Sequence, residues 1–236
     1  MRTSLVTSMK TIAMNNTFTW TACAVAIALT SCGAPAETNS EAPTAKEEIK
    51  TPEAVEFMGG TYAVDQEAST VKWKGTEITT KYHEGTVRVY KGSINVIDKS
   101  ISDGFVAIDM SSMVCTDEGM NDDSKASLIG HLQSDDFFGV EQFPFSRIDI
   151  EGIKTKGDVS YAYGKMYVRD IGAPINFPVT ISEEDGNMVV EASLTFDRSK
   201  HDVKFRSGAF PDLFPNLGDK LINDDIELDV HIVAAL

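Results

Sequence analysis

The sequence predicts a mainly β protein, either a closed antiparallel barrel or a sandwich of about eight to ten strands. Three observations support this. Apolar and polar residues alternate with period two through most of the chain from Thr61 onward. Turn-forming residues interrupt this alternation at short intervals, and no helical segments alternate with the strands. Antiparallel strands with one buried and one solvated face produce such a pattern.

The predicted strands follow one another along the chain. The alternating runs are 71–75, 87–89, 94–96, 105–110, 148–151, 161–168, 175–181, 190–196 and 226–232. Turns are predicted at 98–100, 155–158, 172–174 and 184–186, and a turn or kink at 91–93. One segment breaks the alternation: Leu128, Ile129 and Leu132 have helical spacing after the polar start Asn121-Asp-Asp-Ser. This pattern predicts one short helix, packed on the barrel.

Charge and cysteine content exclude other classes. The formal net charge is -15, from 36 acidic and 21 basic residues. Such a surface repels phosphates, so nucleic acid is excluded as a partner. Three cysteines cannot form a disulfide framework.

The N-terminal segment has the features of an export signal. Arg2 and Lys10 precede an apolar run at 20–32, and the first acidic residue is Glu37. The run ends in Leu29-Thr-Ser-Cys32-Gly, which resembles a bacterial lipobox. We therefore predict a lipoprotein signal peptide at 1–31 and lipidation of Cys32. The alternatives are plain secretory cleavage at Ala34 or Ala36, and a start at Met9 rather than Met1.

Two further segments follow. Residues 32–58 are rich in Pro, Ala, Thr and Glu and are predicted to form a flexible acidic tether; residues 59–236 form the barrel domain. Loss of Arg2 and Lys10 with the signal would make the chain two units more negative. Cys115 would then be the single thiol, which favours a small buried apolar residue over a nucleophile or metal ligand.

Several blocks, in order, resemble the YceI-like family. The strongest is His131-Leu-Gln-Ser-Asp-Asp-Phe-Phe-Gly-Val-Glu-Gln-Phe-Pro144, which resembles the helix-to-strand signature H-L-x-S-x-D-F-F-x-V-x-x-x-P. Segments 62–73, 83–87, 194–198 and 218–228 resemble other blocks of the family. The segment 170–175 departs from it, because its glycine and proline are shifted.

The resemblance implies a lipocalin-like antiparallel β-barrel of about eight strands with one short helix. It also implies an elongated apolar cavity that holds a polyisoprenoid or similar lipid, and a periplasmic or secreted location. An eight-stranded barrel is wide enough for one small ligand. The inward residues predicted to line this cavity, rather than to pack as core, are Trp73, Phe105, Ile108, Met110, Met166, Phe177, Leu194 and Phe196.

Other candidate sites have simpler interpretations. Phe137, Phe138, Phe143 and Phe145 form either an aromatic rim for a ligand or, as we favour, a plug for one barrel end. The four histidines lack metal-ligand spacing and are predicted to be structural. The acidic loop 117–123 lacks the spacing of a calcium loop. No motif for nucleophilic catalysis or phosphate binding occurs, so we predict neither a metal, a cofactor nor an enzyme.

The sequence therefore predicts a carrier in the cell envelope, periplasmic or on the outer membrane, anchored by its N-terminal lipid. Its ligand is an isoprenoid lipid, with a quinone among the candidates, and its self-association is left open. Two alternatives remain: an interaction or adhesion lipoprotein with a filled barrel, and an enzyme acting on a lipid.

Overall fold

The computed structural model describes residues 56–78 and 81–236, and these form a closed antiparallel barrel. The proposed signal peptide, Cys32 and nearly all of the proposed tether lie outside the described residues. The elements are β1 (Gly60–Val64), β2 (Thr70–Glu77), β3 (Tyr82–Ile97), β4 (Ser100–Cys115), α1 (Asp122–Gln133), β5 (Phe145–Lys156), β6 (Val159–Val168), β7 (Ile171–Glu184), β8 (Asn187–Asp197), η1 (Arg198–His201), η2 (Gly218–Lys220) and β9 (Ile222–Ala235). Among them, no helix is long and apolar enough to cross a membrane.

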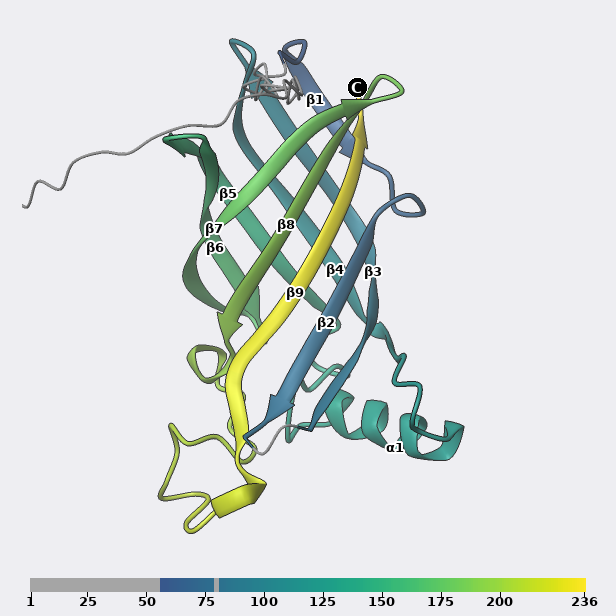
Figure 1. The fold of residues 1–236 in the computed structure, drawn as a ribbon, viewed down its shortest axis with the longest axis vertical. Coiled ribbons are helices and arrows are strands. Elements are labelled where there is room, and N and C mark those ends of the chain that lie inside the picture. Colours follow the sequence, from purple (N-terminus) through teal and green to yellow (C-terminus); the bar gives the residue numbers. More distant parts are fainter. Residues whose placement is uncertain (1–55, 79–80) are drawn as a thin grey trace, which may run out of the picture. The chain divides into compact units, whose positions relative to one another are not determined.

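The nine strands occupy eight positions in the barrel wall. The short strands β1 and β2 share one position between β3 and β9. Consecutive antiparallel strands from β3 to β9 make up the rest, and the pairing of β2 with β9 closes the wall (Figure 1). This is the eight-stranded antiparallel barrel with one helix that the sequence predicts.

The hairpin turns explain where the chain reverses. Two hairpin turns have the positive φ angles that tight two-residue turns require, one at Asp98 and Lys99 and the other at Asp185 and Gly186. Both turns fall where the sequence predicts them. The turn predicted at 172–174 is wrong. The chain instead reverses at Arg169 and Asp170, with φ of 53° and 59°, and 172–174 lies inside β7.

Pro174 is compatible with a strand because one flank of β7 is unpaired. From Ile171 to Val179, β7 pairs with β6 alone, and its pairing with β8 begins only at Thr180. The prolines at 174 and 178 have the same parity, so both turn their missing N–H groups to the same side of the strand. The pairing of β7 with β6 continues without a shift past both prolines. The missing N–H groups therefore face away from β6, toward β8. The two strands accordingly diverge from their shared hairpin (Figure 1).

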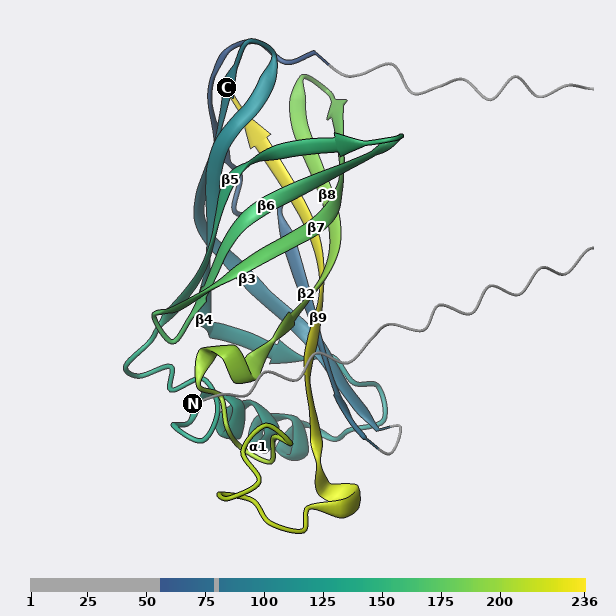
Figure 2. The same cartoon turned by 90° about the vertical axis from the view of Figure 1, so that its left-hand side faces the viewer.

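The helix α1 covers one end of the barrel, called here the α1 end (Figures 1 and 2). Asn121 caps it by accepting a hydrogen bond from the Ser124 N–H at 2.8 Å. The connection between β8 and β9, with η1 and η2, lies at the same end (Figure 2). At the opposite end, the barrel is filled by packed side chains that include Tyr62, Met188 and Ala234. The interior between these two ends holds the candidate site.

Candidate functional site: two adjoining chambers inside the barrel

The barrel interior contains two chambers that share part of their walls. The upper chamber has a volume of about 120 Å³ and the lower chamber, next to α1, about 280 Å³. Ile108, Ser146, Met166 and Leu228 line both, so the chambers adjoin at these four residues. Protein cores contain few voids larger than one water, which needs roughly 10–15 Å³. Two adjoining spaces of this size therefore leave room for a ligand inside the barrel.

The upper chamber is almost wholly apolar. Its walls come from β2 to β9 and are mostly isoleucine, valine and leucine, and Phe105 and Phe177 also border it. Arg147 borders it, but its guanidinium forms an ion pair with Asp149 at 2.7 Å and is half exposed, so its charge lies on the outer surface. Such a space can hold an aliphatic chain and offers it no hydrogen bond.

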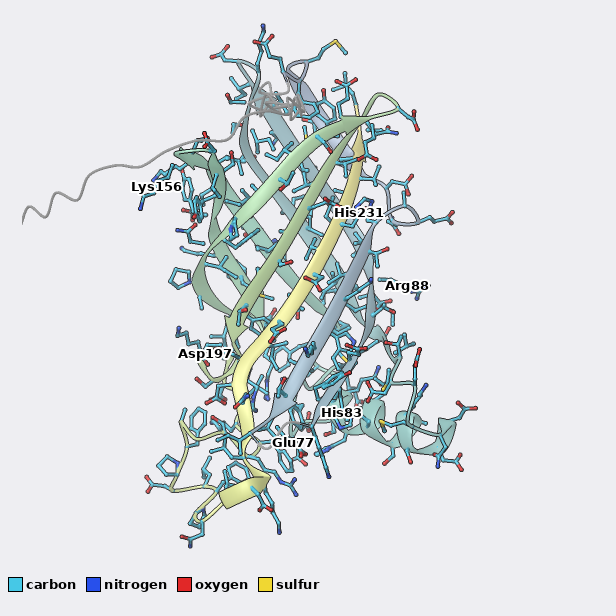
Figure 3. The ribbon with its side chains drawn as sticks, in the orientation of Figure 1. Glu77, His83, Arg88, Lys156, Asp197 and His231 are labelled. Atoms are coloured by element: carbon cyan, nitrogen blue, oxygen red, sulfur yellow. The ribbon has the colours of Figure 1, made fainter. Side chains whose placement is uncertain are left out.

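The lower chamber combines apolar and polar walls. Phe137 and Phe138 are buried there beside α1, and Leu128 and Leu132 of the helix contribute to the wall. Glu77, His83, His131 and Arg206 also border it. Figure 3 shows Glu77 and His83 close to the α1 end. The polar groups of the site are thus concentrated in one of its two halves.

All eight predicted lining residues border one or both chambers. Phe105, Phe177 and Leu194 line the upper chamber, Trp73, Met110 and Phe196 line the lower one, and Ile108 and Met166 line both. Seven of them have the parity of the inner face, whereas Phe105 has the opposite parity to Ile108 on β4 and pairs with the outer residue Asp149, so its side chain does not face the interior. Their contact with a lipid stays a prediction.

The four phenylalanines do not act together. Phe137 and Phe138 are buried in the wall of the lower chamber. Phe145 is 42% exposed and packs on Tyr90, with ring centroids 4.3 Å apart. Phe143 lies under the Arg169 guanidinium at 5.5 Å. Of the four rings, only Phe137 and Phe138 line the lower chamber.

Trp73 is held flat against a glycine on the neighbouring strand. Trp73 of β2 is paired with Gly85 of β3. A Cβ on Gly85 would lie 2.7 Å and 2.8 Å from the indole atoms Cζ2 and Cε2 and would collide with the Val114 carbonyl oxygen. The absence of this side chain makes room for the indole ring and fixes its position in the chamber wall.

His83 is oriented by an acidic partner. Its Nδ1 lies 2.6 Å from Asp117 Oδ2, and Asp117 Oδ1 accepts the Glu84 N–H at 2.9 Å. Burial alone would raise the pKa of Asp117, but the hydrogen bonds from His83 and Glu84 outweigh it and lower this pKa below its usual range. Asp117 is thus a carboxylate that holds the imidazole in one orientation.

Arg198 closes the floor of the lower chamber as a buried structural cation. Its guanidinium donates to the carbonyl oxygens of Val203, Phe205, Ile222 and Asn223 at 3.0–3.2 Å, and its Nη2 lies 3.2 Å from Asp224 Oδ1. Burial lowers the pKa of Arg198, and the charges of Asp224 and Asp197 oppose this shift. Four of its N–H groups donate to these carbonyl oxygens, so it ties the β8–β9 connection to β9.

Sequence reasoning missed the polar half of the site. It treated His83 and His131 as structural, and the structure places both at the lower chamber. His201 is buried, with Nδ1 2.7 Å from the Ile171 carbonyl oxygen, and His231 lies on the outer wall near Glu191. Parity alone could have indicated His83, which has the same parity as the inward-facing Val87.

Other reactive groups do not form a reaction centre in the described ranges. Burial raises the pKa of the Cys115 thiol, so it is protonated at neutral pH. Within residues 56–78 and 81–236, no three His, Cys, Asp or Glu side chains gather closely enough to hold a metal ion. What the arrangement can do is enclose an elongated apolar molecule.

Comparison with known proteins agrees with this geometry. A family model described as the YceI-like domain matches residues 62–234. The chain belongs to the YceI-like family. No curated protein matches the sequence closely enough to be counted as a relative.

Two solved structures of the same fold are similar to this YceI-like chain. The structure of Burkholderia cenocepacia BcnA is 18% identical, with a TM-score of 0.57, and the match covers 73% of this chain and 99% of that one. A polyisoprenoid-binding domain from Saccharophagus degradans, implicated in plant cell wall breakdown, is 12% identical with a TM-score of 0.54, covering 74% and 97%. At these identities the similarity establishes the fold of the YceI-like domain.

Proposed function

We propose that this YceI-like protein is a lipid-anchored, non-enzymatic carrier that holds one polyisoprenoid or similar long apolar lipid inside its barrel. The observation that carries the proposal is the pair of adjoining chambers, one of them walled almost entirely by aliphatic and aromatic side chains. Each methylene-sized group that leaves water contributes about 0.8 kcal/mol to binding. The polyisoprenoid-binding domain of the same fold supports this choice of ligand.

The filled-barrel alternative is less well supported. An interaction lipoprotein would need a packed interior, whereas the two chambers leave space for a ligand. An enzyme acting on a lipid would need a reacting group at the chamber wall. The polar residues there are either paired within the protein, as Arg198 is, or suited to hydrogen bonding, as His83 is.

Trp73 provides a direct test of ligand entry. The chain has two tryptophans, Trp20 and Trp73, so a full chain with Trp20→Phe has its single indole in the lower chamber. After delipidation, titration with a long-chain isoprenoid is expected to shift the Trp73 emission and to saturate at one molecule per chain. A linear change without saturation, or no change, would count against the carrier.

The anchor is tested separately. We expect Cys32→Ala to release the protein from the membrane fraction and to remove its lipid label, because this thiol is the acceptor that the lipobox-like segment offers. The barrel should remain folded, since its core consists of residues after position 56. Circular dichroism and metabolic labelling with a fatty acid measure the two effects. Lipid labelling that persists in the Cys32→Ala protein contradicts the anchor but leaves the carrier untouched.

A further inference from the structure

The connection between β8 and β9 forms a loop that projects from the α1 end of the barrel (Figures 1 and 2). Its two ends are joined, because the Ile222 N–H donates to the Arg206 carbonyl oxygen at 3.0 Å. The intervening residues 207–221, called here the α1-end loop, have the length and the closed ends of an Ω-loop. Ser207 at the start of the loop is fully buried, so the loop is fixed at its base.

The tip of the α1-end loop is apolar. The Leu213 side chain is 59% exposed. The N–H groups of Leu213 and Phe214 both donate to the Phe210 carbonyl oxygen, at 3.1 and 3.2 Å, which turns the chain back toward the barrel. An exposed cluster of apolar side chains is typical of a contact surface. The large apolar residues and prolines of this tip are Phe210, Pro211, Leu213, Phe214, Pro215 and Leu217.

Neighbouring aromatic rings connect this tip with the lower chamber. The ring centroid of Phe214 lies 5.7 Å from that of Phe205, and the Phe205 centroid lies 5.3 Å from that of Phe137. Phe205 and Phe137 both line the lower chamber, so an apolar track leads from the tip to the cavity. The opposite end of the barrel also exposes apolar side chains, such as Ile97, but the interior there is filled by packed residues.

The charge of this region differs from that of the whole chain. Residues 203–221 include three basic and two acidic residues, whereas the formal net charge of the chain is -15. The Lys204 ammonium lies over the Phe210 ring at 5.7 Å, and the Arg206 guanidinium lies over the Phe205 ring at 5.1 Å. Cations behind an apolar tip suit the surface of a bilayer, because the tip is buried while the cations stay among the phosphates.

We propose that the α1-end loop docks the protein on a lipid bilayer and passes an apolar lipid between the bilayer and the lower chamber. The tip around Leu213 is buried below the head groups, and Lys204 and Arg206 lie at their level. The aromatic track from Phe214 to Phe137 then begins at the membrane. Docking on the bilayer stands without the proposed function, whereas the transfer step rests on it.

Vesicle flotation tests the docking. The full chain with Cys32→Ala, called here the parent, excludes binding through a lipid anchor, and each variant carries this change. The parent should float with vesicles of phosphatidylethanolamine and phosphatidylglycerol. Leu213→Asn should lower the affinity for the vesicles about tenfold, because the burial of one leucine side chain is lost. Flotation of the parent should persist in about 1 M NaCl, where the Debye length is ~3 Å.

Ile97→Asn is the matched control. Ile97 ends β3 at the opposite end of the barrel and is 60% exposed, so its substitution removes a similar amount of exposed apolar surface. This variant should float as the parent does. Because both side chains are exposed, both variants should keep the circular dichroism spectrum and the unfolding midpoint of the parent.

Transfer is measured with donor vesicles that contain geranylgeraniol labelled with nitrobenzoxadiazole, together with a rhodamine lipid that quenches it. Uptake by the delipidated protein relieves the quenching. Leu213→Asn should slow this uptake about tenfold, as it lowers vesicle affinity. Its affinity for the same probe delivered from ethanol without vesicles should be unchanged, because Leu213 does not line the chamber. Ile97→Asn should match the parent in both measurements.

The outcomes separate docking, transfer and carriage. A parent that does not float, or equal losses in Leu213→Asn and Ile97→Asn, would overturn the docking surface and favour a protein partner for the loop. Flotation that is lost in high salt would overturn the burial of the tip. Weaker docking of Leu213→Asn with uptake at the parent rate would overturn the transfer step. Failure of the parent to bind the probe even without vesicles would contradict the carrier, while the docking surface stands.

Discussion

Phe177→Asp is expected to abolish lipid retention. Phe177 is buried in the wall of the upper chamber, where its neighbours are apolar. A carboxylate at this position would need water to solvate it, and burial of an unpaired charge beside a hydrocarbon tail is strongly unfavourable. The readout is the amount of lipid extracted with organic solvent per mole of purified protein.

The neighbouring residue provides the matched control. Asn176 faces outward on the same strand, so Asn176→Asp adds the same charge without changing the chamber. It should retain lipid at the wild-type level. If Phe177→Asp does not fold by circular dichroism, Phe177→Leu takes its place and should change which chain lengths are retained. Full retention with an unchanged chain-length profile in a folded Phe177 variant would contradict the assignment of the upper chamber.

Arg198→Met should destabilise the fold by about 3–5 kcal/mol, because removing one partner of a buried ion pair leaves the other charge uncompensated. The Arg198 side chain is fully buried, and its loss would leave Asp224 without its ion-pair partner and four carbonyl oxygens without their donor. The change is measured as a lower midpoint of urea unfolding with an unchanged slope.

Arg88→Met is the control for the loss of an arginine. Arg88 projects from the outer wall and is 77% exposed, and its closest approach to Asp109 is 3.7 Å (Figure 3). Surface pairs of this kind contribute about 0–1 kcal/mol. Equal effects of the two substitutions would mean that Arg198 does not tie the β8–β9 connection to the barrel.

Strand parity is a local property, so the sequence indicates which apolar residues face the barrel interior, whereas their contact with a ligand stays a prediction. Residues such as Met166 and Phe196 alternate with polar neighbours, and alternation on a strand places them on the inner face. The helix could also be predicted from the sequence, since Asn121 and the spacing of Leu128 and Leu132 are local signals.

The polar part depends on contacts between distant residues. His83 and Asp117 are 34 residues apart, and the buried Arg198 is neutralised by Asp224 from another strand. Strand parity indicates that His83 faces inward, but no local pattern reveals its pairing with Asp117 or the burial of Arg198. The misplaced turn has a similar origin: Pro174 favours a turn by composition, but the unpaired flank of β7 lets it lie in a strand.

The central claim is that the barrel holds a long apolar lipid in its two chambers. The most direct measurement is organic extraction of the full-length protein purified from its native cells, followed by mass spectrometry of the extract. The account predicts about one isoprenoid lipid per chain. A protein that carries no stoichiometric lipid, and takes up none when delipidated and incubated with isoprenoids, would contradict the carrier.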